Sequence, residues 1–359
     1  NLDKVLEALD YAKQVNVGYL VRDHRFSKAK DEKELLEIIS PYYQHDAFAG
    51  ILVADEPGVI DYEKLRKLQD NFKKIAPDKC FYVNLLPIYA EVNQFTNGAL
   101  GGEVVIDEID AMYYYCEYVK KLEPKFLSYD YYPLEGKYPN IKETYYEQLS
   151  IIRDVCRKKN IPFWNFVQCC SFNDNVRIPN EIEIFWQINT SLAYGVKGIQ
   201  YFTYFIPLEI EPEHFKGSMI DVKGRPTPIY YYVQSANEHI NAIDEILMEA
   251  SHLGLLVTDD RNKLIPSQDL VDIKELSSCS GKNGLIGYFN YYEDKVLFLV
   301  NTSLNEDVES YQLNFIANYY ISIIQKKEKK EITTNSLTLK LIGGEGVLIK
   351  ISIKEEVKK

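Results

Sequence analysis

Segments with helical and strand-like patterns alternate along the chain as far as about residue 250. Apolar residues recur at helical spacing in 2–14, 31–43, 62–75, 106–122, 142–159, 181–194 and 227–250. Short apolar runs, several ended by proline, lie between them at 17–21, 50–58, 79–87, 126–133, 161–168 and 199–205. Helix and strand units that repeat every ~30–40 residues predict parallel strands joined by crossover helices.

Such a pattern allows a closed barrel or an open, doubly wound sheet. No glycine-rich phosphate loop follows any strand, which disfavours the nucleotide-binding sheet. The pattern contains about six strands, whereas a full barrel needs eight, and the chain starts within a helix. We therefore expect an α/β fold, a (β/α)8-type TIM barrel over 1–254, whose first strands precede Asn1.

The pattern changes after about Gly254. Short alternating stretches separated by polar turns, such as 285–289, 295–301, 311–315 and 346–351, predict a small antiparallel β-sandwich over 255–353. The charge run at 326–330 is typical of a solvated hairpin tip, and 354–359 forms a charged tail.

Charge and cysteine content limit the possible partners. A net charge of -12 and a pI near 5.1 argue against nucleic acid, which requires a basic surface. No apolar run reaches the ~18 residues that a membrane span needs. The six cysteines show no CxxC spacing, so the sequence predicts neither a metal site nor a disulfide framework. Because of its negative charge, the chain is better suited to a neutral or cationic ligand than to a polyanion such as nucleic acid.

The strand ends carry polar side chains. If the strands are parallel neighbours, one face presents Asp23, Asp55, Glu56, Asn84, Asp130, Tyr132, Gln168, Tyr201 and Tyr204. Carboxylates, amides and tyrosine hydroxyls around a cup suit a polyol and the cleavage of a glycosidic bond. Alternatively, Asp55 caps the following helix, Asn84 and Gln168 satisfy backbone groups, Asp23 pairs with an arginine, and one of Tyr201 and Tyr204 packs in the core.

Several of these segments resemble clan A glycoside hydrolases, nearest to the β-galactosidase-like barrels. The similar segments are Asp-Glu-Pro at 55–57, Asn-Leu-Leu-Pro at 84–87, Ser-Tyr-Asp-Tyr-Tyr-Pro at 128–133, Phe-Trp-Asn-Phe-Val-Gln at 163–168, and the run from Trp186 to Tyr204. The ending at 344–348 is similar to the β-sandwich that follows many such barrels. The resemblance implies that Glu56 ends the fourth strand as the acid/base.

The resemblance also implies that the strand ending at Gln168 is the seventh, where these enzymes keep a nucleophilic glutamate. An amide cannot take that role, and Asp130 is the best substitute as nucleophile or as base for a water. Asp130 can instead be a hydroxyl-binding or structural carboxylate. A hydrolase using Glu56 and Asp130 on an oligosaccharide or glycoside, with no cofactor, is therefore one hypothesis. A catalytically silent carbohydrate-binding barrel is the other. The resemblance favours a secreted or cell-surface location, with a cytoplasmic one also open.

Overall fold

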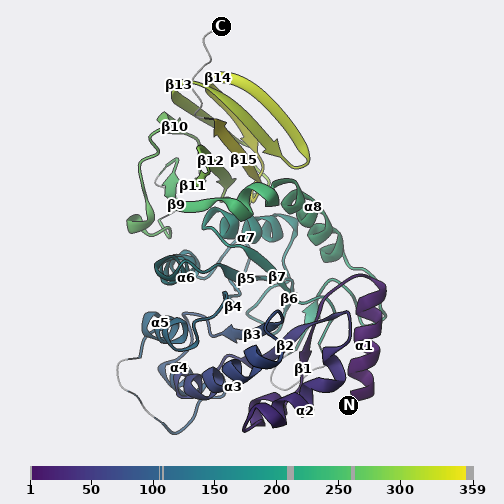
Figure 1. The fold of residues 1–359 in the computed structure, drawn as a ribbon. Helices are drawn as coiled ribbons and strands as arrows, with labels where there is room; N and C mark the ends of the chain where they lie inside the picture. The colour runs from purple at the N-terminus through teal and green to yellow at the C-terminus, as the bar shows by residue number, and fades with distance from the viewer. Residues whose placement is uncertain (1, 105, 107–108, 208–213, 260–262, 353–359) are drawn as a thin grey trace. The chain divides into compact units, whose positions relative to one another are not determined.

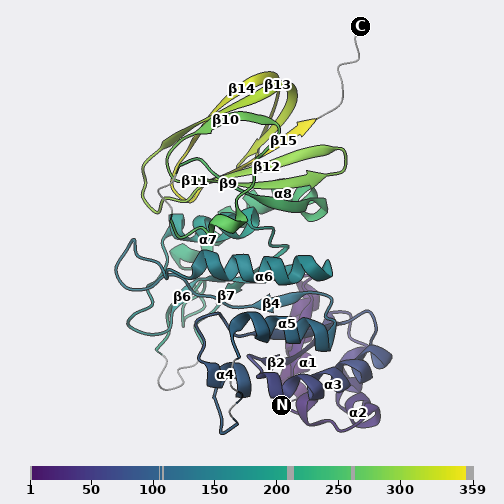
Figure 2. The same cartoon turned by 90° about the vertical axis from the view of Figure 1, so that its left-hand side faces the viewer.

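The structure, a computed structural model, describes residues 2–104, 106, 109–207, 214–259 and 263–352 (Figures 1 and 2). The predicted charged tail at 354–359 lies outside the described residues. Two compact units divide the chain. The first comprises Asn1–Asp130 and Val155–Pro162, and the second comprises Tyr131–Asp154 and Phe163–Lys359.

The first unit alternates helices with parallel strands. Its elements are α1 (Leu2–Gln14), β1 (Tyr19–Arg22), α2 (Glu32–Tyr43), β2 (Phe48–Asp55), α3 (Tyr62–Ile75), β3 (Cys80–Leu85), α4 (Val92–Asn97), α5 (Ala111–Leu122) and β4 (Leu127–Tyr129). Each strand pairs in parallel with the next along the chain. The register sets Asp55 beside Asn84 and Asn84 beside Ser128. Consecutive strand ends therefore lie at one edge of the sheet.

Apolar packing between helices and strands explains this arrangement. A buried cluster joins the inner faces of α1, α2 and α3 to β1 and β2, through Leu9, Val21, Leu35, Ile51 and Phe72. Burial of such side chains stabilises a fold by about 25 cal/mol per Å² of apolar surface. The helices predicted at 2–14 and 62–75 are confirmed.

The second unit continues the alternation. It contains most of α6 (Tyr145–Lys159), which also runs into the first unit, then β5 (Phe163–Gln168), α7 (Glu181–Ala193), β7 (Gly198–Phe202) and α8 (Pro228–Glu249). The short strands β6 (Cys170–Ser171) and β8 (Lys216–Gly217) pair with each other. Strands β5 and β7 are parallel, with Gln168 opposite Phe202. The described α/β part has six parallel strands, and the predicted TIM-barrel-like fold is confirmed as a partial barrel.

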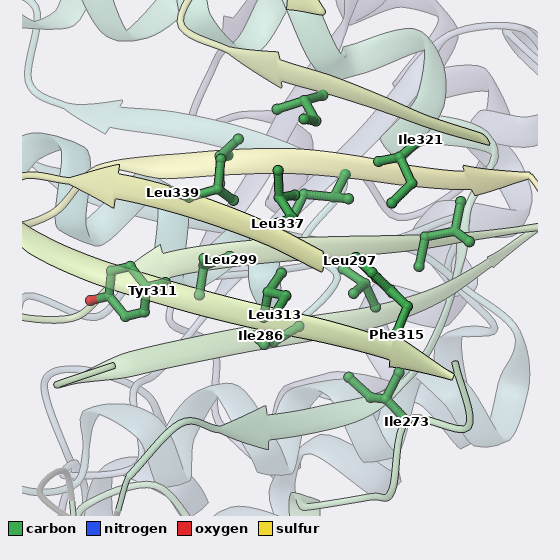
Figure 3. Close-up of a cluster of buried hydrophobic side chains, with 14 of the residues drawn as sticks. Ile273, Ile286, Leu297, Leu299, Tyr311, Leu313, Phe315, Ile321, Leu337 and Leu339 are labelled. Carbon is green, nitrogen blue, oxygen red and sulfur yellow. The ribbon is translucent and has the colours of Figure 1, made fainter. Parts of the chain in front are cut away.

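The C-terminal strands form one antiparallel sheet, β9 (Ser251–Val257), β10 (Leu276–Ser280), β11 (Gly284–Tyr291), β12 (Asp294–Asn301), β13 (Glu309–Gln325), β14 (Glu328–Leu341) and β15 (Gly346–Ser352). Strand β13 breaks register between Asn314 and Tyr319; its first part pairs with β10 and its second with β15. The sheet thus folds over a core that includes Ile286, Leu297, Leu313 and Leu337 (Figure 3). The predicted β-sandwich is confirmed, and the charge run begins at its β13–β14 turn.

Helix α7 packs closely on the sandwich within the second unit. A Cβ atom added at Gly287 of β11 would lie 2.4 Å from the carbonyl oxygen of Ala193 at the end of α7. A capping box between Asn180 and Glu183 fixes the start of the helix. Glycine is needed at position 287 because any side chain would collide with backbone.

Candidate active site

Three neighbouring strand ends in the first unit converge on one amide. The Nδ2 atom of Asn84, on β3, donates to Asp130 Oδ1 at 3.0 Å and lies 3.4 Å from Asp55 Oδ1. Asp55 ends β2, and Asp130 follows β4. The structure therefore brings together three of the predicted site residues. Asp55 makes this contact and an ion pair with Arg22 at 3.9 Å, whereas the N-cap of α3 is Asp61.

Buried hydroxyls fix the direction of the Asn84 amide. Its Oδ1 accepts from Ser128 Oγ at 3.1 Å, and Ser128 Oγ lies 2.8 Å from the hydroxyl of Tyr82. Asn84 is only 5% exposed, and Ser128 is fully buried. Because Oδ1 is occupied by a donor, Nδ2 is the group that faces the two carboxylates.

The shared amide limits the separation of the two carboxylates. The two contact distances sum to 6.4 Å, so Asp55 Oδ1 and Asp130 Oδ1 lie no farther apart than that. Pairs of catalytic carboxyl groups in glycosidases lie ~5–5.5 Å apart when they retain configuration and ~6.5–9.5 Å apart when they invert it. Asp55 and Asp130 therefore belong to one cluster of strand-end carboxylates that the Asn84 amide holds together.

Glu56 lies in a left-handed backbone conformation, with φ of 51°. Its N–H donates to the Asn84 carbonyl at 2.8 Å, and its own carbonyl accepts from Ala99 N at 3.0 Å. Left-handed geometry is uncommon for residues other than glycine and is often found at functional sites. The neighbouring strand and the loop after α4 hold this backbone in place.

The Pro57–Gly58 pair that follows is equally constrained. The Tyr114 hydroxyl donates to the Pro57 carbonyl at 2.7 Å. A Cβ atom at Gly58 would lie 2.2 Å from the Thr96 carbonyl oxygen. Within the Asp-Glu-Pro-Gly sequence, Gly58 is therefore a position where the neighbouring backbone requires glycine.

A cavity of about 380 Å³ opens beside this turn. It is lined by both carboxylate residues of the turn, by polar groups and by the loop after α4, including Asp55, Glu56, Asp61, Lys64, Asn97 and Leu100. Its volume falls within the range of small-ligand sites, ~300–1,000 Å³. Asp55 and Glu56 therefore border this cavity, whereas Asn84 and Asp130 are not among the residues that line it.

Asp23, at the end of β1, is held in internal contacts. Its carboxylate accepts from Arg25 Nη2 at 2.6 Å and from the Tyr42 hydroxyl at 3.1 Å. The bonds from Arg25 lower the pKa of Asp23 from 3.8 to about 2. This bonding favours the alternative in which Asp23 belongs to an internal arginine pair.

In the second unit, Gln168 is fully buried and bonded at both ends of its amide. Its Oε1 accepts from Leu134 N at 3.1 Å, and its Nε2 donates to the Arg177 carbonyl at 2.7 Å. The Gln187 side chain accepts from its backbone N–H at 2.8 Å. These bonds favour the alternative in which Gln168 satisfies backbone groups.

The three predicted tyrosines, also in the second unit, differ in their surroundings. Tyr132 is buried against Phe172 and Phe202, with ring centroids 5.2 and 5.3 Å away. The Tyr201 hydroxyl donates to Asn237 on α8 at 2.5 Å, and burial raises its pKa. Tyr204 is 55% exposed. Tyr204 is therefore the one with a ring open to solvent.

The sequence did not point to Ser128 or Tyr82 as site residues. Each lies two residues before a predicted one, Tyr82 before Asn84 and Ser128 before Asp130. Among the residues that the structure describes, no group of three or more His, Cys, Asp or Glu side chains could hold a metal ion. Within the same ranges, no helix has the length and apolar character needed to cross a membrane. All six cysteines lie in the described part of the chain, and none of them forms a disulfide there.

Comparisons with known proteins place the chain among distant structural neighbours. No known protein-family model and no curated protein matches the sequence. The structure is similar to an Anoxybacillus alpha-amylase, with 10% identity, coverage of 91% of this chain and 64% of that one, and a TM-score of 0.48. It is similar to a family 39 glycoside hydrolase from Bacteroides cellulosilyticus WH2, with 10% identity, coverage of 89% and 61%, and a TM-score of 0.46.

A third similar structure is a beta-galactosidase from Halorubrum lacusprofundi, with 17% identity, coverage of 54% of this chain and 26% of that one, and a TM-score of 0.38. The chain thus spans less than two thirds of the length of each of these proteins. By name they are glycoside hydrolases, the class that the sequence resembles.

Proposed function

We propose that the chain is a glycoside hydrolase that cleaves an oligosaccharide or glycoside with carboxylates at its strand ends. The observation that carries this proposal is the convergence of Asp55 and Asp130 on the amide of Asn84, next to Glu56. Glycosidic cleavage needs a proton donor and a second carboxylate around one sugar. The resemblance of the Asp-Glu-Pro segment to clan A enzymes supports the same chemistry.

In this mechanism Glu56 donates its proton to the glycosidic oxygen as the bond from that oxygen to the anomeric carbon breaks. Asp130 then either forms an ester with the anomeric carbon or takes a proton from an attacking water. In the first case water later hydrolyses the ester, with Glu56 acting as base. Both routes use only the groups of the protein and water, and neither needs a cofactor.

In this mechanism Asn84 orients the Asp130 carboxylate through its hydrogen bond, in addition to any contact with the sugar. A hydrogen bond from a buried amide favours the charged form of a carboxylate and fixes its direction. Asp55, whose side chain is about half exposed, is suited to accept a bond from a sugar hydroxyl.

A catalytically silent carbohydrate-binding barrel is the second candidate. The bonding of Gln168 supports it, because this residue stands where the resemblance expects the nucleophilic glutamate and its amide is fully used by backbone. A silent barrel would bind saccharides and cleave none.

A panel of aryl glycosides, assayed with the wild-type chain and with Glu56→Gln and Asp130→Asn, distinguishes the two functions. The hydrolase predicts release of the aryl group from at least one glycoside and loss of ~10²-fold or more in each variant with the circular dichroism spectrum kept. Saccharide binding that both variants retain, without any hydrolysis by the wild type, would instead establish the silent barrel.

A further inference from the structure

The second unit contains a cavity of about 740 Å³ that the proposed hydrolysis does not use. It lies among α7, α8, the β13–β14 turn and the turn before β15. Residues from each of these segments line it, including Glu181, Phe185, Ser235, His239, Gln325 and Glu345. All of them belong to the second unit, whereas Asp55, Glu56 and Asp130 belong to the first.

His239 gives this cavity a buried ring nitrogen, Nε2, that lacks a hydrogen-bond partner among the described residues, while the imidazole also interacts with the backbone of Lys326. The side chain is 4% exposed, and Nε2 makes no hydrogen bond to any residue that the structure describes. Its ring lies 6.3 Å from both Phe185 and Phe298, measured between centroids. Burial lowers the pKa of His239, so the imidazole is neutral at pH 7. Leaving a buried polar atom unsatisfied is unfavourable, and a ligand that donates to Nε2 would relieve this penalty.

Glu345 adds a second, fixed acceptor. It is 8% exposed, and its Oε2 accepts from the backbone of Ile342 at 3.0 Å. Its Oε1 accepts from Gln325 Nε2 at 3.2 Å and lies 3.6 Å from Lys326 Nζ. A carboxylate oxygen accepts more than one hydrogen bond, so Glu345 retains capacity for a further donor.

The remaining lining selects the class of ligand. Four glutamates and two lysines line the cavity, so its side chains carry a net negative charge while His239 is neutral. This balance disfavours anions. Phe185, Ile182 and Ile342 provide an apolar wall. A pyranose ring matches both features, because it offers C–H groups to an aromatic face and hydroxyls to acceptors.

We propose that this cavity is a second binding site, which takes a neutral sugar or similar polyol of up to about disaccharide size. One hydroxyl donates to His239 Nε2 and another to Glu345, while the ring lies against Phe185. The site stands on its own residues, and it does not require that the chain hydrolyse glycosides.

Nuclear magnetic resonance with histidine-labelled protein tests this site, using glucose, galactose, maltose and lactose as separate probes. At least one sugar is expected to shift the Nε2 resonance of His239 and to give saturation transfer to its own ring protons. His239→Phe keeps the aromatic packing but removes the acceptor, and it should weaken sugar binding by ~10-fold or more in the Asn84→Ala background. Glu345→Gln provides a second variant if His239→Phe does not fold.

His45→Phe is the matched control, since His45 lies in the first unit and bonds Asp10. It should leave the sugar affinity unchanged. The His239 resonance reports on this cavity, since His239 belongs to the second unit and the strand-end carboxylates belong to the first, so failure here does not bear on hydrolysis. The proposal is wrong if none of the four sugars shifts His239, or if binding in that background survives both His239→Phe and Glu345→Gln.

Discussion

The side-chain amide of Asn84 donates to Asp130 at 3.0 Å across two adjacent parallel strands. Ser128 occupies the other end of the same amide, so the donor cannot turn away without losing a buried bond. Asp130 is therefore held by a fixed group, which catalysis by a carboxylate requires.

Asn84→Ala removes the donor that Asp55 and Asp130 share. We expect kcat/KM to fall by ~10²-fold, because the two carboxylates lose their common orienting group. Stability should fall by ~1–3 kcal/mol because the buried Ser128 hydroxyl loses its acceptor, Asn84 Oδ1. Glycoside hydrolysis and urea unfolding measure the two effects.

Ser128→Ala serves as the comparison, since it removes only the bond behind the amide. Its effect on kcat/KM should be several-fold smaller than that of Asn84→Ala. Equal losses of kcat/KM in the two variants would contradict a direct role for the Asn84 donor.

Asp23→Asn tests whether Asp23 stabilises the fold. The pKa of Asp23 is about 2 in the folded chain, below the ordinary 3.8. Its ionised form therefore stabilises the fold fully above pH ~4, and this contribution is lost as the pH falls through ~2. Because Arg25 is half exposed, we expect about 1–2 kcal/mol at pH 7.

Urea unfolding of wild type and Asp23→Asn at several pH values measures this contribution. The difference in unfolding free energy should shrink as the pH is lowered from 4 to 2.5. A difference that stays constant over that range, or a variant as stable as wild type at pH 7, would be against the structural assignment.

Gln168→Glu introduces the residue type that the resemblance to clan A enzymes implies for this strand end. We expect no gain in activity and a loss of stability of ~2–3 kcal/mol, because a carboxylate oxygen would replace the amide that donates to the Arg177 carbonyl at 2.7 Å. Thermal unfolding and the glycoside assay check both parts. An increase in kcat/KM would show that Gln168 occupies the catalytic centre after all.

Gly287→Ala tests the packing of α7 on the sandwich. The new methyl group would meet the backbone oxygen of Ala193, which cannot rotate away, and ~1–3 kcal/mol of stability should be lost. In Gly254→Ala the nearest atoms, 2.5 Å away, belong to the Val271 side chain, which can shift. The first variant should therefore have the lower melting temperature, and the reverse order would refute the argument.

Periodicity predicted the elements with long apolar faces well. The helices at 2–14 and 62–75 have the predicted bounds, since one face of each is buried. The predicted helix at 106–122 begins only at Ala111, because Asp110 caps it there by accepting from Tyr113 N. Strand β4 is limited to Leu127–Tyr129, although an apolar run extends to residue 133. The periodicity of apolar residues does not indicate the residue at which backbone pairing between strands ends.

The sequence predicted which residues would lie at the site better than it predicted the contacts between them. The order of parallel strands predicted that Asp55, Asn84 and Asp130 would share an edge. The shared amide depends on register, and the left-handed Glu56 depends on the loop after α4, neither of which the local sequence encodes. The role of Gln168 was ambiguous because its partners, the Leu134 N–H and the Arg177 carbonyl, are backbone groups outside its own strand, which the strand pattern does not specify.

The most direct test measures kcat/KM of the wild type and of Glu56→Gln with two aryl glycosides. The leaving group of one is a strongly acidic phenol, and that of the other is a weakly acidic phenol. An acidic phenol leaves without a proton, whereas a weakly acidic one needs the proton that Glu56 supplies. We predict that kcat/KM for the weakly acidic phenol falls by ~10²-fold or more, while that for the acidic phenol changes far less. Equal losses for both substrates, or no glycoside cleavage by the wild-type chain, would contradict the account.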